Sequence, residues 1–249
     1  MVASRRVQLE PAFLLHQKQW RDSSRIVDFL TRDHGRVTLF AKGVRRAGSH
    51  WQAVLLPFGP LVISWSGSGD GGTLTGAEVG ARPVPVAPSC LMSAFYLNEL
   101  VLKLLGREDS HPDVHDAYAL ALAALASPAD EHRGLRLFEK RLLEAIGVGL
   151  DYAHLVDGGA RVEPDRYYHV NPARGVTAEA ADPFLPSVCR GADLLSLGGE
   201  DLSTPASVAV ARRVLRAAIN TALDGKELSS RRVARAVQER RTGKEESRR

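Results

Sequence analysis

Apolar residues recur in two different patterns along this chain, and the pattern changes after residue 82. Up to that point they come in short runs with β-branched and aromatic side chains, which is typical of strands. The runs are Phe13–Leu15, Ile26–Leu30, Arg36–Ala41, Leu61–Trp65 and Thr73–Val79. Five short strands within the first 82 residues predict a small closed barrel, because an open sheet of that size would leave two strand edges exposed.

A proline-rich segment, residues 83–88, separates the strands from a helical region. Its prolines lack a backbone N–H, so the segment suits neither a helix nor a central strand. Beyond it, apolar residues recur every three to four positions, which predicts helices. We expect helices at about residues 91–105, 115–126, 131–146, 207–223 and 229–240.

Residues 150–200 have Gly or Pro every few positions and are expected to form an irregular insert, with short strands such as 166–170 as the exception. The predicted fold class is therefore α+β and multidomain. A five-stranded barrel domain occupies residues 1–82, and a mainly α-helical domain occupies residues 83–241. The basic tail, residues 242–249, is expected to be disordered.

The charges are distributed unevenly, although the formal net charge is only +4. Residues 1–82 carry a net +5, residues 83–225 a net −6, and residues 226–249 a net +5. Cationic clusters attract polyanions such as nucleic acids, and a plain solubility role is the alternative that charge alone leaves open. The hydrophobic content of 44% excludes wholesale disorder.

Two further classes are disfavoured by the sequence. The longest apolar run, Ala119–Ala126, is too short to span a bilayer, and the amino terminus lacks the apolar segment of a secretory signal. A cytoplasmic location is therefore expected. A Gly-x-Ser-x-Gly nucleophile motif is absent, and Cys90 and Cys189 have no catalytic signature around them, so nothing in the sequence indicates an enzyme.

The basic front of the chain carries the candidate binding residues. Its cations surround predicted strand ends and turns, and two tryptophans flank them outside the predicted strands. Cations neutralise phosphates, and an exposed aromatic ring stacks on bases. For each tryptophan the alternative is packing at the ends of the barrel. The candidate DNA-binding residues are Trp20, Arg21, Arg25, Arg32, Arg36, Lys42, Arg45, Arg46 and Trp51.

The same stretch resembles the amino-terminal signature of the RecO family, bacterial recombination mediators. The run from Phe13 to Arg46 reads FLLHQKQWRDSSRIVDFLTRDHGRVTLFAKGVRR, and its "LH", "GR" and "AKG" elements stand at the family's spacing. The segment Tyr96–Leu100 within the predicted helix 91–105, the segment Leu135–Leu143, and the "GK…SR" element from Gly225 to Arg231 are also similar to that family. The order of these pieces covers most of the chain.

This resemblance implies an amino-terminal OB-fold, a helical carboxy-terminal domain and no catalytic turnover. It implies binding to single- and double-stranded DNA, annealing of complementary strands and, with the partner RecR, loading of the recombinase RecA onto DNA coated by single-strand-binding protein (SSB). A location at the nucleoid follows. The family's helical domain docks the acidic, Phe-ending tail of SSB. The residues that we expect to bind it are Arg133, Arg136, Lys140 and Arg141.

The chain departs from the family pattern at one place. Many members carry a four-cysteine zinc site after a "GxxLD" stretch, but here Gly149-Leu150-Asp151 is followed by His154 and Asp157, and Cys189 is the single later cysteine. One thiolate does not hold a zinc knuckle. We therefore predict no zinc and no other cofactor.

One competing class stays open at this stage. The chain could be a non-enzymatic adaptor that binds a protein or an anionic membrane surface through its basic ends. The oligomeric state, the preference between single and double strands and any dependence on a RecF-type partner cannot be predicted from these residues.

Overall fold

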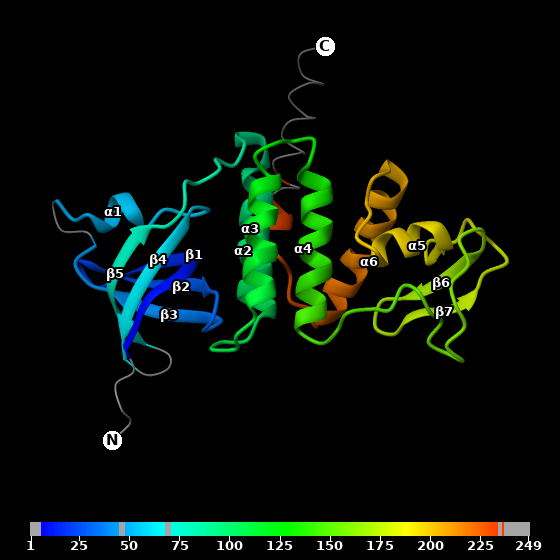
Figure 1. Ribbon diagram of the computed structural model, residues 1–249, viewed down its shortest axis with the longest axis horizontal. Coiled ribbons are helices and arrows are strands. Elements are labelled where there is room, and N and C mark those ends of the chain that lie inside the picture. Colours follow the sequence, from blue (N-terminus) through cyan, green and yellow to red (C-terminus); the bar gives the residue numbers. More distant parts are fainter. Residues whose placement is uncertain (1–5, 45–47, 68–70, 234–235, 237–249) are drawn as a thin grey trace, which may run out of the picture. The chain divides into compact units, whose positions relative to one another are not determined.

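The computed structural model describes residues 6–44, 48–67, 71–233 and 236, and it begins with a β-barrel (Figure 1). The barrel strands are β1 (Arg6–Trp20), β2 (Ser24–Thr31), β3 (Arg36–Ala41), β4 (Pro60–Ser66) and β5 (Gly72–Val79), and a short helix α1 (Trp51–Val54) lies between β3 and β4. The strands close in the order β1-β2-β3-β5-β4. All neighbours are antiparallel except β3 and β5. This confirms the predicted fold class.

Strand β1 is longer than the apolar run that predicted it. The polar residues after Leu15 continue the strand to Trp20, so Trp20 is a strand residue and not a loop residue as predicted. The cause is pairing: Lys18 lies opposite Ile26 and Trp20 opposite Ser24, so the backbone hydrogen bonds of β2 hold the polar half of β1 extended.

The outer surface of the barrel is partly covered by two helices. Helices α2 (Leu91–Leu104) and α3 (Pro112–Ala124) follow the short 3₁₀ turn η1 (Pro88–Cys90). Phe13 of β1 is buried with its ring 5.0 Å from the rings of His115 and Tyr118 on α3. Asn98 of α2 donates from Nδ2 to the carbonyl of Leu15 (2.7 Å) and accepts a hydrogen bond from the hydroxyl of Tyr118.

These contacts change where the chain divides. The chain forms two compact units. One comprises Met1–Glu131 with Leu228–Arg249, and the other comprises His132–Glu227. Helices α2 and α3 thus belong with the barrel, because strand residues such as Phe13, Leu15 and Leu30 are buried outside the barrel core. The domain boundary at residue 82 remains a prediction, and the tail 242–249 lies outside the described residues.

The second unit holds more regular structure than the sequence indicated. It contains α4 (Glu131–Ala145), β6 (Tyr167–Asn171), β7 (Gly175–Glu179), β8 (Val188–Arg190), α5 (Gly191–Gly198) and α6 (Pro205–Ala222). The three strands form one antiparallel sheet in the order β7-β6-β8. The expectation of an irregular region at 150–200 was therefore wrong, apart from the short strand near 166–170. Strands of three to five residues joined by tight turns are too short to show a period of their own.

Candidate nucleic-acid interface

One half of the outer surface of β1–β3 is open and positively charged. Antiparallel register places Lys18, Ile26 and Phe40 side by side, because Lys18 pairs with Ile26 and Ile26 with Phe40. Trp20 is two positions beyond Lys18 and therefore shares this face. Lys42 follows β3 directly and is exposed. We call this set, Lys18, Trp20, Ile26, Phe40 and Lys42, the cationic face.

Two aromatic rings lie together on the cationic face. Trp20 is 43% exposed, and its ring centroid is 6.0 Å from that of Phe40. The loop between β4 and β5 passes beside them: the N–H of Gly71 donates to the carbonyl of Thr38, and a Cβ at Gly71 would lie 3.3 Å from the Phe40 ring. An exposed indole next to lysines is an arrangement on which a nucleobase can stack while its phosphate meets a cation.

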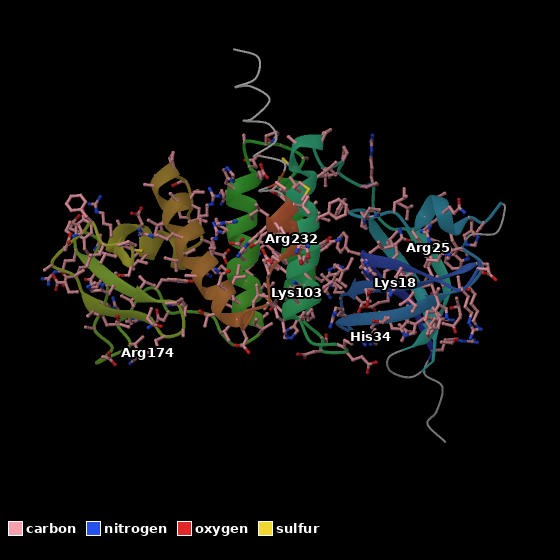
Figure 2. All side chains as sticks on the ribbon, turned by 180° about the vertical axis from the view of Figure 1, so that it is seen from behind. Lys18, Arg25, His34, Lys103, Arg174 and Arg232 are labelled. Atoms are coloured by element: carbon pink, nitrogen blue, oxygen red, sulfur yellow. The ribbon has the colours of Figure 1, made fainter. Side chains whose placement is uncertain are left out.

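Two arginines adjoin the cationic face. Arg21 is exposed in the turn between β1 and β2, with a left-handed backbone (φ 53°). Arg25 of β2 donates from Nη1 to Oε1 of Gln17 (2.6 Å), which holds its guanidinium at this end of the barrel. Figure 2 shows Arg25 and Lys18 on the barrel strands. Within the described ranges, none of Lys18, Arg21, Arg25 and Lys42 forms an ion pair with a carboxylate.

The structure does not bring all the predicted cations together. Arg32 and Arg36 lie at the other end of the strands, and six residues of extended chain separate Arg36 from Lys42 by about 20 Å. Arg32 pairs with Asp33 (3.5 Å) and Asp116 (3.4 Å), and the hydrogen bond to Asp116 raises the pKa of Arg32.

Arg36 has a contact within its own unit as well. Its Nη1 donates to the carbonyl of Leu102 (3.0 Å) in the last turn of α2, where helix carbonyls lack partners within the helix. Arg32 and Arg36 thus connect the barrel to α3 and α2, so their side chains contribute to the packing of this unit.

The remaining candidates of the barrel differ in placement. Trp51 begins α1, partly buried against the barrel core with its ring 4.5 Å from that of His50, which is the end-packing role that the sequence left as the alternative. Arg45 and Arg46 lie outside the described residues.

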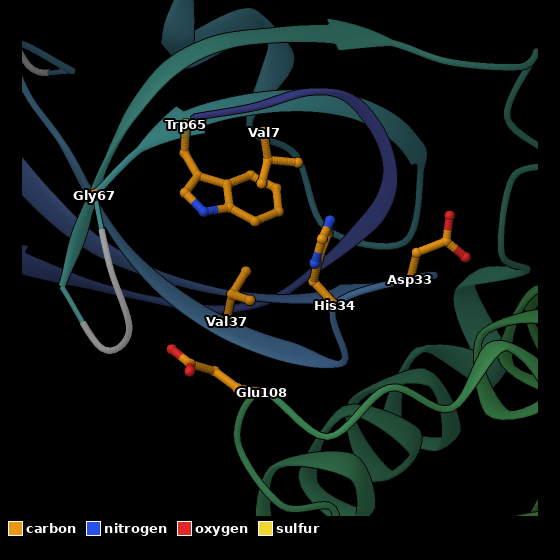
Figure 3. Close-up of a pocket in the computed structure, with 7 residues that line it drawn as sticks. All are labelled: Val7, Asp33, His34, Val37, Trp65, Gly67 and Glu108. Atoms are coloured by element: carbon orange, nitrogen blue, oxygen red, sulfur yellow. The ribbon is translucent and has the colours of Figure 1, made fainter. Parts of the chain in front are cut away.

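A cavity at the Arg36 end of the barrel has the opposite electrostatic character. It has a volume of about 220 Å³ and is lined by Val7, Val37, Trp65, His34 and Glu108, among others (Figure 3). The carboxylate of Glu108 borders it, and Asp33 also belongs to its lining, although Figure 3 shows the Asp33 carboxylate pointing away. Carboxylates repel phosphates, and the described lining includes no Lys or Arg, so this cavity suits a polyanion less well than the cationic face does.

The four cations predicted to bind the SSB tail lie on α4, and most of them have acidic partners. Arg136 is largely buried and donates from Nη2 to Glu139 (2.8 Å). Lys140 pairs with Glu144 (2.8 Å) and Glu200 (3.3 Å).

Arg141 binds both carboxylate oxygens of Glu200 (3.1 and 2.6 Å), and this hydrogen bonding lowers the pKa of Glu200. Arg133 is exposed, and within the described chain it has no carboxylate partner. The sequence spacing correctly placed these residues on one helix but could not reveal that Glu200, about 60 residues away, pairs with Lys140 and Arg141.

Sequence reasoning missed three members of the cationic face, Lys18, Ile26 and Phe40. The signal that could have found Lys18 is the alternation His16, Lys18, Trp20 along β1, which places all three on one side of a strand. Ile26 and Phe40 join this face through the pairing of β1 with β2 and of β2 with β3. Among the described residues, no cluster of three or more His, Cys, Asp or Glu side chains could hold a metal ion. The absence of zinc stays a prediction.

The chain matches two family models in succession. "Recombination protein O N terminal" covers residues 7–81, and "Recombination protein O C terminal" covers residues 88–232. The chain belongs to the RecO family. The proline-rich segment between the two models is the one that the sequence indicated as a boundary.

Curated RecO relatives agree with this assignment. The chain is 41% identical over 232 residues to the "DNA repair protein RecO" of Ralstonia nicotianae, which corresponds to 93% of this chain and 85% of the relative. It is 38% identical to those of Azoarcus sp. BH72 (96% and 100% covered) and Thiobacillus denitrificans (96% of each). The protein is thus a DNA repair protein of the RecO family. None of the described helices is long and apolar enough to cross a membrane.

Proposed function

We propose that this RecO protein binds single- and double-stranded DNA and anneals complementary strands without catalytic turnover. With RecR it would help to load RecA onto single-stranded DNA coated by SSB. The observation that carries the DNA-binding part is the cationic face, where lysines without a carboxylate partner in the described ranges border an exposed indole. Family membership supports the rest.

The chemistry of the cationic face suits the backbone of a nucleic acid more than a specific sequence. Lys18 and Lys42 are ammonium groups on flexible stems, which contact phosphates as point charges and read no base edges. Each phosphate contact releases condensed counterions, so affinity depends steeply on salt. Neutralising two strands in this way reduces their mutual repulsion, which allows complementary bases to pair.

The experiment that tests this function is a strand-annealing assay on complementary oligonucleotides, bare and coated with SSB, across a salt series. We expect Lys18→Glu/Lys42→Glu to reduce annealing severely while the fold is retained. Arg36 is not a suitable target, because its guanidinium contacts α2 and its loss would disturb packing. Annealing that is unchanged in the lysine variant would refute the assignment of the cationic face.

A matched control removes charge without touching the cationic face. Arg174 and Arg190 pair with Asp157 (3.0 Å) and Asp165 (2.9 Å) in the second unit. Arg174→Glu/Arg190→Glu makes the same change in net charge as the lysine variant, so it should leave annealing near the natural level. Vesicles of anionic lipid, tested in parallel, address the alternative of a membrane adaptor, which predicts vesicle binding without oligonucleotide binding.

Recognition of the SSB tail by α4 is also a proposal. Because Arg136, Lys140 and Arg141 already have carboxylate partners, Arg133 is the α4 cation most open to a tail carboxylate. We expect Arg133→Glu to weaken binding of a labelled acidic peptide ending in Phe. If that variant binds the peptide as tightly as the natural chain, Arg133 has no part in tail binding.

A further inference from the structure

Helix α6 presents an unusual outer face. Its inner side is apolar and buried, and Thr204 and Ser207 form a capping box at its start. The outer side carries three arginines, Arg212, Arg213 and Arg216, and the 18 residues of the helix include no Asp or Glu. Solvated helix faces usually mix both signs of charge, so a face of one sign requires an explanation.

The outer face of α6 also forms a shallow groove. The groove has a volume of about 360 Å³. Its lining residues follow the helical spacing i, i+3, i+4, i+7, i+8 and i+11, so they make one continuous stripe. The lining consists of Ala209, Arg212, Arg213, Arg216, Ala217 and Asn220.

Two of the three arginines are available to a ligand. Arg213 donates from Nη2 to the carbonyl of Val188 (2.6 Å), which fixes it against β8. Arg212 and Arg216 are exposed, and neither has an ion pair or hydrogen bond within the described ranges. They lie about one helical turn apart, with Cβ atoms about 6 Å from each other, so the helix presents a pair of neighbouring positive charges.

Other arginines of the same unit behave differently. Arg141, Arg166, Arg174 and Arg190 each pair with a carboxylate of their own unit. Four arginines of this unit are thus neutralised within it, whereas Arg212 and Arg216, like Arg133 on α4, have no carboxylate partner among the described residues. What distinguishes α6 is that two such arginines share one face with no acidic residue on the helix, and such a face can bind an anion that comes from outside the chain.

The lining of the groove indicates which class of anion. Protein partners are held mainly by aromatic or large aliphatic anchors in pockets, and the apolar part of this groove consists of the two alanines. A nucleic-acid backbone needs no such pocket, because regularly spaced charges suffice. We propose that the outer face of α6 is a second phosphate-binding surface, which holds a nucleic-acid strand separately from the cationic face of the barrel.

This inference rests on the proposed DNA-binding function and adds a second site to it. The two surfaces belong to different compact units, so one molecule has two places at which to hold a backbone. Two strands bound to one molecule raise each other's effective concentration, which favours annealing. A single site on the barrel would give no such gain.

The stoichiometry of binding tests the second site. Eight-nucleotide oligothymidine is titrated at low salt into four proteins. They are the natural chain, the α6 variant Arg212→Gln/Arg216→Gln, the barrel variant Lys18→Gln/Lys42→Gln, and the quadruple variant with all four changes. We expect two oligonucleotides per natural chain, one for each double variant and none for the quadruple variant. The control variant Arg174→Gln/Arg190→Gln removes two arginines of the same unit that have carboxylate partners, and it should still bind two oligonucleotides per chain.

Each other result is decisive. If the α6 variant binds as many oligonucleotides as the natural chain while the barrel variant loses one, the α6 site is refuted and the barrel site stands. If the natural chain binds none, the proposed function itself fails. If an acidic peptide binds the natural chain but not the α6 variant, and oligothymidine binding is unaffected, the groove is a protein site and the inference is overturned. Thermal melting of every variant verifies folding.

Discussion

The salt dependence of oligonucleotide binding separates the two physical roles of the cationic face. Lys18→Gln/Lys42→Gln removes two phosphate contacts without reversing the charge. Each contact to a single strand adds about 0.7 to the slope of log affinity against log salt, so the loss of two lowers the slope by about 1.4. At 0.1 M salt this corresponds to an affinity about 25-fold weaker, and the difference vanishes as salt approaches 1 M.

Trp20→Ala provides the contrast. Loss of stacking on one base costs about 1–3 kcal/mol, or roughly 5- to 150-fold in affinity. Stacking releases no counterions, so this loss should be the same at every salt concentration. The Trp20 ring contacts Phe40, and the phenyl group remains as part of the platform, so the lower end of the range is expected.

Both effects can be measured by fluorescence anisotropy of a labelled eight-nucleotide strand from 0.05 to 0.5 M salt. All proteins in this experiment carry Arg212→Gln/Arg216→Gln, so the slopes of log affinity against log salt contain no contribution from α6. Parallel lines for the lysine variant and its parent would refute the reasoning, because they would mean that the lysines contact no phosphate. A Trp20→Ala effect that disappears at high salt would likewise show that the indole acts through charge placement and not through stacking.

Two further predictions concern stability. Asn98→Ala removes the amide that bonds the buried carbonyl of Leu15 and the buried hydroxyl of Tyr118, which should lower the free energy of unfolding by about 2–6 kcal/mol and Tm by roughly 5–20 °C. An unchanged Tm by calorimetry would contradict the role of this network. The second concerns Glu200, whose pKa is lowered by Arg141 in the folded state, so its stabilisation is complete above the ordinary glutamate pKa and is lost as pH falls through the lowered value. Glu200→Gln should therefore reduce stability at pH 7 by about 1 kcal/mol or less and show a smaller drop in Tm between pH 6 and pH 3; equal drops in both proteins would exclude the ion pair as a source of stability.

The fold could be predicted from the sequence where its pattern is local. Alternating and β-branched runs indicated the five barrel strands, and the 3.6-residue period indicated α2, α3, α4 and α6 to within a few residues. The polar half of β1 was not predicted, because it is extended only by virtue of its pairing with β2. The small sheet of β6, β7 and β8 was missed for the same reason: its short strands depend on partners distant in sequence.

The candidate site could be predicted only in part. Cation counts correctly drew attention to the barrel, but sequence cannot tell a lysine that faces solvent from an arginine that binds a helix end. Arg36 begins β3 and Lys42 directly follows its last residue, so these two cations lie at opposite ends of one strand. Likewise, the spacing of Arg136, Lys140 and Arg141 gave no information about Glu200, which lies about 60 residues further along the chain.

The junction at which the barrel closes lies beside the cationic face, so hydrogen exchange at this junction can report DNA binding. Among the described residues, strands β3 and β5 pair at two positions, Leu39 with Gly72 and Phe40 with Thr73, which is the shortest ladder in the barrel. Phe40 belongs both to this junction and to the cationic face, so a strand of DNA stacked there would cover the junction and oppose its opening. Amide hydrogen exchange at Phe40 and Thr73 should then slow when DNA binds, and a protection map would locate the bound strand without any substitution.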